Sequence, residues 1–247
     1  MSEDNSAWYQ TWFDTAYYHT LYQDRDVAEA KFFLQNLIRK LSIESSDRIL
    51  DVACGRGRHA LYLAEQGFSV SGLDLSPNSI SYAKSEASKR GLSVSFYVHD
   101  MRTKAQEEAD VILNVFTSIG YFEDKSDNTK AIRAFYDSLS SGGRAVIDFM
   151  HVPLVKQNLV NQEEVTKGGI VFNLSRAYNQ GWITKKIVFS DQEKTHTYQE
   201  RVSALELDDF KHMFQEVGFT LEHTFGNYAL APFDSATAER LILVVRK

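Results

Sequence analysis

Residues 48–60 read Arg-Ile-Leu-Asp-Val-Ala-Cys-Gly-Arg-Gly-Arg-His-Ala, and this stretch is the strongest indicator of the fold. Its apolar start, over residues 48–53, is typical of a buried strand. Gly55 and Gly57 allow the backbone to turn sharply and to approach a ligand where the next helix begins. Taken alone, the Gly-x-Gly-x-x-Ala spacing also satisfies the dinucleotide-binding pattern, so the surrounding residues must distinguish between ligands.

Short apolar runs alternate with helical patterns after this point. We expect strands at residues 48–53, 68–73, 93–98, 110–115 and 144–149, with helices ending at residue 66 and spanning residues 77–90 and 126–139. Ser76 before Pro77 is a favourable helix start, because serine caps the first turn and proline fits the first helical position. Strands and helices that alternate at this spacing predict βαβ units, a parallel sheet and an α/β fold.

The pattern changes in the second half of the chain. Three β-rich segments (163–178, 182–190 and 195–203) follow one another with turn residues between them and no helix, which predicts an antiparallel β-meander. A helix over residues 207–218 and two strands at 219–225 and 240–246 complete the chain. Upstream, residues 7–42 have the pattern of two helices, of which the first is rich in Trp and Tyr.

Acidic residues lie at the ends of the first three predicted strands. Asp51 precedes the first glycine by four residues, where a carboxylate would repel a pyrophosphate but favour a ligand with an ammonium group. Asp74 ends the second strand, where an acid can accept both ribose hydroxyls of an adenosine. Asp100 ends the third, where it can meet an adenine amino group. Ligands of open α/β sheets bind at the carboxyl ends of the strands, so we expect these acids to share one site.

The chain resembles a class I S-adenosylmethionine-dependent methyltransferase of the small-molecule type, closely over residues 48–150 and in layout over residues 205–247. The resemblance rests on Leu50-Asp-Val-Ala-Cys-Gly-Arg-Gly57, Gly72-Leu-Asp-Leu-Ser76, His99-Asp100-Met101 and Val111-Ile-Leu-Asn-Val-Phe-Thr-Ser-Ile-Gly-Tyr-Phe122. It implies S-adenosyl-L-methionine as the cofactor, with Asp51 serving the methionine moiety, Asp74 the ribose and Asp100 the adenine. The cofactor-binding residues that it implies are Asp51, Ala53, Cys54, Gly55, Gly57, His59, Asp74, Leu75, Ser76, Asp100, Met101, Asn114, Phe116 and Tyr22.

The same resemblance implies a Rossmann-like, seven-stranded and mainly parallel sheet with an antiparallel last strand, plus the inserted antiparallel β-meander. We therefore expect one methyltransferase domain over residues 1–247. Its expected parts are an N-terminal helical cap (1–45), a cofactor-binding core (46–150), the β-meander (151–204) and a C-terminal helix with a β-hairpin (205–247). The β-meander has two open interpretations, as a wall of the substrate pocket or as a homodimer contact.

Methyl transfer from a sulfonium is a single in-line displacement, so such an enzyme mainly positions the acceptor. A base is needed only where the nucleophile must lose a proton. The candidate catalytic residues are Tyr121, after the fourth strand, and His151, after the fifth. The alternatives are a packing role for Tyr121 and a strand-end hydrogen bond for His151. The aromatic residues of the first helix could form a cage over the cofactor or face the core; they are Tyr9, Trp12, Tyr17, Tyr18 and Tyr22.

Composition argues against several other functions. With 27 Lys and Arg against 33 Asp and Glu, the net charge is -6 at pH 7, which disfavours a nucleic-acid partner. Cys54 is the single cysteine and the seven His are scattered, so no metal site is expected. The apolar runs are too short to cross a membrane and the N-terminus has no leader pattern, so we expect a cytoplasmic setting without membrane partners.

These observations predict an enzyme that transfers a methyl group from S-adenosylmethionine to N or O of a small metabolite. A carbon acceptor stays open. The alternatives are an RNA or protein methyltransferase, or a non-catalytic S-adenosylmethionine-binding module. The absence of an Asn/Asp-Pro-Pro-Tyr/Phe segment after the fourth strand disfavours a nucleic-acid substrate. Asp51 disfavours a nicotinamide oxidoreductase.

Overall fold

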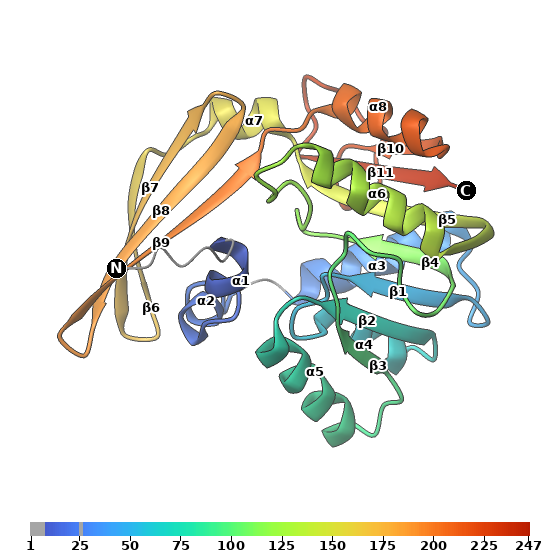
Figure 1. The fold of residues 1–247 in the computed structure, drawn as a ribbon, viewed down its shortest axis with the longest axis horizontal. Coiled ribbons are helices and arrows are strands. Elements are labelled where there is room, and N and C mark those ends of the chain that lie inside the picture. Colours follow the sequence, from blue (N-terminus) through green and yellow to red (C-terminus); the bar gives the residue numbers. More distant parts are fainter. Residues whose placement is uncertain (1–7, 25–26) are drawn as a thin grey trace.

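The computed structural model describes residues 8–24 and 27–247, which form a seven-stranded and a four-stranded β-sheet (Figure 1). The order in the larger sheet is β10-β11-β5-β4-β1-β2-β3. Its strands are β1 (Arg48–Val52), β2 (Ser69–Asp74), β3 (Ser95–Val98), β4 (Ala109–Asn114), β5 (Leu139–Met150), β10 (Thr220–Phe225) and β11 (Arg240–Arg246). Strands β1 to β5 pair in parallel, β11 is antiparallel to β5, and β10 is antiparallel to β11. The predicted Rossmann-like sheet with an antiparallel last strand is confirmed.

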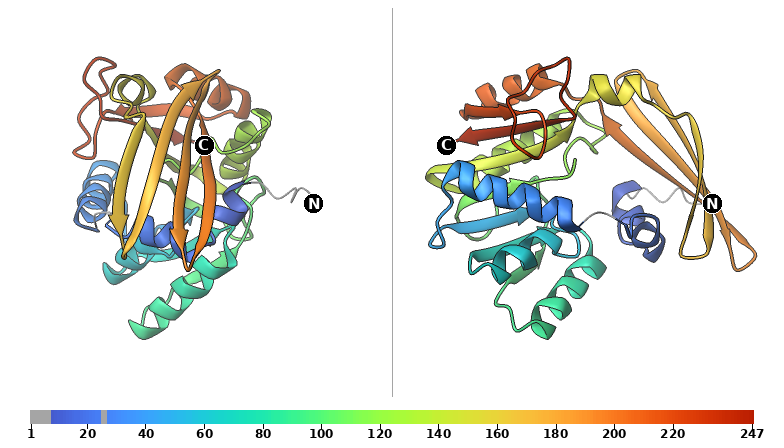
Figure 2. Two further views of the ribbon diagram at one scale, coloured as in Figure 1. Left: turned by 90° about the vertical axis from the view of Figure 1, so that its left-hand side faces the viewer. Right: turned by 180° about the vertical axis from the view of Figure 1, so that it is seen from behind.

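Helices cover both faces of this sheet (Figure 2). One face carries α3 (Val27–Leu41), α4 (Arg58–Glu65) and α5 (Pro77–Lys89), and the other carries α6 (Ser126–Ser138) and α8 (Leu207–Val217). The side chains of β11 alternate between the two layers, since Leu243 and Val245 pack on the α6 side while Ile242 and Val244 pack on the α3 side. All four are completely buried, as expected for a strand covered on both faces.

Local sequence signals account for several element boundaries. Helix α5 begins where Ser76 and Pro77 predict it, because the Ser76 hydroxyl accepts a hydrogen bond from the Ser79 N–H at 3.0 Å. Strand β5, in contrast, begins at Leu139 rather than at Arg144 as predicted. The pairing with β4 shifts between Ala109↔Leu139 and Val111↔Arg144, so the intervening glycines lie in an irregularity within the strand instead of a turn before it.

The predicted β-meander is present as the four-stranded antiparallel sheet, with the order β6-β7-β8-β9. Its strands are β6 (Gln162–Lys167), β7 (Ile170–Asn179), β8 (Trp182–Asp191) and β9 (Lys194–Ser203). The first predicted segment, 163–178, is therefore two strands rather than one. Gly168 and Gly169 separate them, with φ angles of 55° and 78° that glycine adopts without steric penalty in a two-residue hairpin turn.

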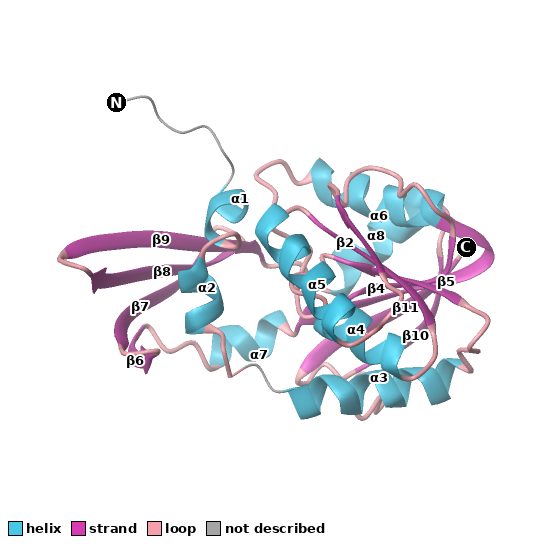
Figure 3. Ribbon diagram, turned by 90° about the horizontal axis from the view of Figure 1, so that it is seen from below, coloured by secondary structure: helices cyan, strands magenta, loops and turns pink. Residues whose placement is uncertain are grey.

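Two short helices, α1 (Trp8–Trp12) and α2 (Ala16–Leu21), replace the single aromatic helix that the sequence predicted. They lie between the four-stranded sheet and the carboxyl ends of the parallel strands (Figures 1 and 3). Trp12 and Leu21 pack on Phe172, Ile187 and Phe189 of the four-stranded sheet. We call α1, α2 and the turn between them the aromatic cap. A further short helix, α7 (Val152–Gln157), follows β5 and was not predicted.

The predicted division of the chain at residues 45, 150 and 204 stays a prediction. Within residues 8–24 and 27–247, none of the helices combines the length and the apolar character that a membrane span requires.

Gly57 provides a test of the packing beneath the turn between β1 and α4. It has a φ angle of 79°, and a Cβ atom placed on it would lie 2.8 Å from Phe96 Cζ. Gly67 also has a left-handed φ angle of 89°, but a Cβ there would meet nothing within 4 Å. Both Gly→Ala variants lose about 1–2 kcal/mol from the left-handed backbone, and Gly57→Ala should lose about 1–3 kcal/mol more through overpacking. Urea denaturation measures the difference, and equal losses would contradict this account of Gly57.

Candidate active site

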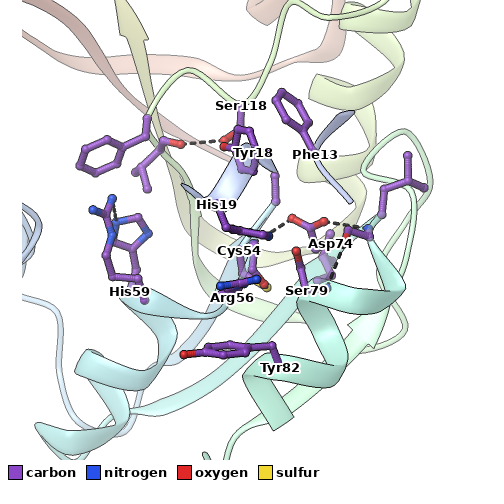
Figure 4. A pocket seen from close by; sticks show the side chains of 18 of the residues that line it. Phe13, Tyr18, His19, Cys54, Arg56, His59, Asp74, Ser79, Tyr82 and Ser118 are labelled. Atoms are coloured by element: carbon purple, nitrogen blue, oxygen red, sulfur yellow. Dashed lines mark hydrogen bonds between the residues drawn. The ribbon is translucent and has the colours of Figure 1, made fainter. Parts of the chain in front are cut away.

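A cavity of about 570 Å³ lies at the carboxyl ends of β1, β2 and β4, beneath the aromatic cap (Figure 4). Its wall includes the turn after β1, the end of β2, the segments after β3 and β4, and side chains from α1 and α2. This is the edge of the sheet at which open α/β folds bind their ligands.

The turn after β1 brings the backbone to the cavity. Ala53, Gly55 and Gly57 have positive φ angles of 60°, 54° and 79°, so the chain reverses through left-handed conformations before α4 begins. The Cys54 N–H donates to the Leu73 carbonyl at 3.0 Å, which ties the turn to β2. A Cβ atom placed on Gly55 would meet nothing within 4 Å. The turn therefore leaves open space beside its backbone, as a ligand site requires.

Asp51 is the most unusual side chain of this region. It is 1% exposed, and neither carboxylate oxygen accepts a well-formed hydrogen bond among the described residues, although the Ala60 backbone N–H favours its ionised form. His59 Nδ1 lies 3.9 Å from Asp51 Oδ2. Burial, followed by the negative charge of Asp74, raises the pKa of Asp51 to about 7. A buried carboxylate without partners is costly, and a positively charged ligand group nearby would compensate it.

Asp74 organises the turn from the end of β2. Its Oδ2 accepts the Gly55 N–H at 2.8 Å and its Oδ1 accepts the Ser76 N–H at 2.8 Å. Burial raises the pKa of Asp74, while these backbone hydrogen bonds act in the opposite direction. Asp14 of the aromatic cap accepts hydrogen bonds from the Ser76 hydroxyl and, at 2.7 Å, from Asn78 Nδ2. The cap is thus fastened to the beginning of α5, next to Asp74.

Asp100 is in the cavity wall, but its carboxylate is engaged. The Arg102 guanidinium binds it through Nε at 3.1 Å and Nη2 at 2.6 Å, and also binds Asp127 through Nη1 at 2.6 Å. Burial would raise the pKa of Asp100, but the hydrogen bonds and charge of Arg102 hold it below its usual range. Any adenine contact would therefore be made by an ionised carboxylate already bonded to Arg102.

The segment after β4 supplies another part of the wall. The Phe116 ring stacks on the His59 ring, with 5.1 Å between centroids and 18° between planes. The Arg58 guanidinium lies 4.5 Å from the centre of the same Phe116 ring. Tyr121 donates its hydroxyl hydrogen to the Thr117 carbonyl oxygen.

The aromatic cap closes the other side of the cavity. Tyr9, Phe13 and Tyr18 line it, and the Phe13 ring lies 5.3 Å from Tyr121 and 4.9 Å from Tyr18. Trp12 and Tyr17, in contrast, are not lining residues. They point to the four-stranded sheet, since Trp12 Nε1 donates to Glu200 at 2.8 Å and the Tyr17 hydroxyl donates to Asp191 at 2.8 Å.

The four-stranded sheet supports the aromatic cap instead of forming the cavity wall. Glu200 accepts the Tyr22 hydroxyl at 2.6 Å, and Lys185 donates to the same hydroxyl oxygen at 2.5 Å. Among the described residues of β6 to β9, none lines the cavity. The interpretation of the meander as a direct pocket wall is therefore wrong, and the homodimer contact stays a prediction.

Most of the residues predicted from the sequence converge on this cavity. Its lining includes Ala53, Cys54, Gly55, His59, Asp74, Leu75, Ser76, Asp100, Met101, Phe116, Tyr22 and Tyr121. Cys54 is buried, and burial together with the charges of Asp51 and Asp74 raises the pKa of its thiol well above the ordinary value. The thiol is therefore protonated and packs as a small apolar group.

Four predicted residues lie outside the lining: Asp51, Gly57, Asn114 and His151. Asp51 lies beside His59, at 3.9 Å from its Nδ1, and Gly57 packs on Phe96. Asn114 Nδ2 donates to the Val52 carbonyl at 3.2 Å, which joins β4 to β1. His151 is 5% exposed and its Nδ1 lies 2.7 Å from the Ala238 carbonyl oxygen. These positions favour structural roles for Asn114 and His151, because neither side chain reaches the cavity.

Sequence reasoning missed several lining residues, among them His19, Arg56, Arg58 and Tyr82. The Arg56 guanidinium lies 4.5 Å from the centre of the Tyr82 ring (Figure 4). Arg56 and Arg58 flank Gly57, so their proximity to the turn was visible in the sequence. The approach of His19 depends on how the aromatic cap docks, which no local pattern indicates.

Comparisons with known proteins agree with this geometry. A family model described as a methyltransferase domain matches residues 49–143, from β1 into β5. A protein of Geobacillus sp. (strain WCH70) with a provisional methyltransferase name is 28% identical over 225 residues, covering 87% of this chain and 90% of its own length. The crystal structure of an S-adenosylmethionine-dependent methyltransferase from Clostridium acetobutylicum ATCC 824 superposes with a TM-score of 0.79 at 19% identity, covering 93% of this chain and 95% of the other.

The chain carries a class I S-adenosylmethionine-dependent methyltransferase domain. This methyltransferase uses S-adenosyl-L-methionine as its methyl donor. The glycine/sarcosine N-methyltransferase of Aphanothece halophytica is also similar to it, with 24% identity over 209 residues that cover 83% of this chain and 76% of the relative.

The residues present fit that cofactor. The unpartnered Asp51 carboxylate suits an ammonium group, the open space beside Gly55 suits a ligand close to the backbone, and Asp74 retains acceptor capacity on both oxygens. Within the described residues of the methyltransferase, no group of three or more His, Cys, Asp or Glu side chains is arranged to hold a metal ion.

The raised pKa of Asp51 predicts a pH-dependent stability. Folding shifts its ionisation from about pH 4 in the unfolded chain to about pH 7. The protonated carboxyl therefore makes its full contribution to the free energy of unfolding below about pH 4. This contribution is lost as the pH rises from there through 7. The Asp51→Asn side chain cannot ionise. The free energy of unfolding of this variant, relative to that of the wild type, should therefore increase by up to about 1.4 kcal/mol per pH unit between pH 5 and 7. Urea denaturation without ligand measures this, and a constant difference would contradict the raised pKa.

Proposed function

We propose that this methyltransferase transfers the methyl group to a nitrogen or oxygen atom of a small metabolite bound in the same cavity. The observation that carries the proposal is the continuity of the lining, which runs from Asp74 at the strand ends to Tyr9, Phe13 and Tyr18 of the aromatic cap. A volume of about 570 Å³ is in the ordinary range of small-molecule sites. The cap covers the strand ends, which favours a small acceptor over a polymer.

We assign the cofactor to the strand-end half of the cavity. Asp74 would accept the ribose hydroxyls, Asp51 would compensate the ammonium group directly or through a water, and Asp100 with Met101 would border the adenine. The other proposed cofactor contacts are Ala53, Cys54, Gly55, His59, Leu75, Ser76, Phe116 and Tyr22. When bound, S-adenosylmethionine supplies a methyl group on a sulfonium that leaves as a neutral thioether.

We assign the acceptor to the half of the cavity lined by the aromatic cap and Tyr121. Tyr9, Phe13, Tyr18 and Tyr121 present ring faces and hydroxyls that can orient an acceptor and exclude water. Tyr121 is the proposed catalytic residue in the sense of contacting the acceptor. Its hydroxyl already donates to the Thr117 carbonyl, so we expect it to position the acceptor rather than to remove a proton.

The similarity to a glycine/sarcosine N-methyltransferase supports nitrogen as the first acceptor atom to test. The net charge of -6 supports a metabolite rather than a nucleic acid. The cytoplasmic setting, the homodimer and the single-domain organisation stay predictions from the sequence.

The experiment that tests this function is a screen for transfer of a labelled methyl group from S-adenosylmethionine. Separate pools contain small amines, amino sugars, hydroxylated metabolites, total RNA and unfolded protein. We expect incorporation into a small-molecule pool, abolished by excess S-adenosylhomocysteine. Incorporation only into RNA or protein would overturn the proposal.

Two variants test the assigned cofactor contacts. Asp74→Ala should weaken S-adenosylhomocysteine binding by about 1–3 kcal/mol through lost ribose hydrogen bonds, and should weaken 5′-methylthioadenosine binding by a similar amount. Asp51→Asn should weaken the binding of S-adenosylhomocysteine but not that of 5′-methylthioadenosine, because 5′-methylthioadenosine has no ammonium group.

Calorimetry provides both affinities, and Asp137→Ala on the exposed side of α6 is the control. Unchanged binding to Asp74→Ala would refute the ribose assignment. Equal effects of Asp51→Asn on the two ligands would refute the ammonium assignment.

A further inference from the structure

The turn after β4 is held in an unfavourable backbone conformation. Phe116 and Thr117 have φ angles of 60° and 59°, although neither is a glycine. Residues other than glycine rarely adopt positive φ angles. They keep such a conformation only where the surrounding structure holds the backbone in it. Phe116 carries its ring into the cavity wall, so the cause of this conformation bears on the site.

One buried carboxylate supports the turn. Asp148, near the end of β5, is completely buried, and its Oδ2 accepts the Phe116 N–H at 2.7 Å and the Tyr228 hydroxyl at 3.2 Å. The Thr117 N–H donates to the Asp148 carbonyl at 2.9 Å. The same residue therefore binds both strained positions, one through its side chain and one through its backbone.

Arg240, at the start of β11, completes the arrangement. Its Nε donates to Asp148 Oδ1 at 2.8 Å and its Nη2 donates to Thr117 Oγ1 at 3.0 Å. Its side chain is 22% exposed and Asp148 is fully covered, so the pair is poorly screened by water. The guanidinium thus neutralises the Asp148 carboxylate and also binds the Phe116–Thr117 turn directly, through the Thr117 hydroxyl.

Ring contacts transmit the position of this turn to the cofactor half of the cavity. The Phe116 ring stacks on His59, whose Nδ1 is 3.9 Å from Asp51, and it also lies 5.5 Å from the Tyr228 ring. A continuous series of contacts therefore joins Arg240 to Asp51, although Arg240 and Asp148 are not lining residues.

We propose that Arg240 is a positioning residue for cofactor binding, because its pairing with Asp148 holds the Phe116–Thr117 turn in its left-handed conformation. The inference rests on the assignment of the cofactor to this cavity. It predicts that Arg240 sets the affinity for the cofactor without touching it.

The test compares two ion pairs that each anchor on β5, Arg240–Asp148 and Arg144–Glu222. Arg240→Met removes the pair beside the turn. Arg144→Met removes the Arg144–Glu222 pair, which has an N–O distance of 2.6 Å and joins β5 to β10 away from the cavity. Calorimetry with S-adenosylhomocysteine is performed at a temperature where each variant is fully folded. We expect about 3- to 30-fold weaker binding for Arg240→Met, and less than a twofold change for Arg144→Met.

A second substitution separates positioning from general stability. Thr117→Gly allows the left-handed conformation without support, so it should restore most of the affinity when it is combined with Arg240→Met. Thr117→Val replaces the hydroxyl that Arg240 binds with a methyl group and keeps the β-branched shape, so it should weaken binding even if Arg240→Met does not fold.

The inference would be overturned if Arg240→Met bound S-adenosylhomocysteine with wild-type affinity or, where that variant does not fold, if Thr117→Val did. Equal losses of affinity in Arg240→Met and Arg144→Met would also overturn it. So would a double variant in which Thr117→Gly restores no affinity to Arg240→Met. Absence of S-adenosylhomocysteine binding to the wild-type protein would instead refute the cofactor site itself.

Discussion

The Asp51 carboxylate is the constraint around which the site is arranged. It lies one residue before the end of β1, buried and without a well-formed hydrogen bond among the described residues, which is unfavourable in the absence of a neighbouring positive charge. The left-handed turn that follows, the hydrogen bond that its Gly55 N–H donates to Asp74 and the stacking of His59 on Phe116 all enclose this position. Under the proposed assignment, an ammonium group bound near Asp51 would offset the stability that its burial costs.

The two sheets contribute in different ways. The parallel sheet delivers the strand-end acids to one edge, whereas the four-stranded sheet acts from outside the cavity. Its Lys185 and Glu200 fix the Tyr22 hydroxyl, and its apolar inner face receives Trp12. Asp14 fastens the opposite side of the cap to the beginning of α5. Methyl transfer depends strongly on how the acceptor is positioned against the methyl group, and a cover fastened on two sides helps to fix that position.

The parts of this structure that depend on local chemistry were predictable from the sequence. Ser76 and Pro77 start α5 where expected, and the acids at strand ends meet because parallel strands share one carboxyl edge. The hairpin at Gly168–Gly169 was not predicted. The segments on both sides of it are rich in strand-forming residues, so residues 163–178 were predicted as one strand. For Trp12 and Tyr17 the sequence left open a cage over the cofactor or a place in the core, because their direction depends on a sheet formed 150 or more residues later. The burial of His151 likewise depends on Ala238, which no nearby pattern indicates.

The central claim is that the strand-end acids and the aromatic cap enclose one cavity for cofactor and acceptor. The most direct measurement is a crystal structure of the protein with S-adenosylhomocysteine. The account predicts the ribose hydroxyls on Asp74, the ammonium group beside Asp51 or joined to it by one water, and the sulfur facing the space between Tyr121 and the cap. A complex in which the ribose does not contact Asp74, or in which the sulfur faces away from the aromatic cap, would contradict it.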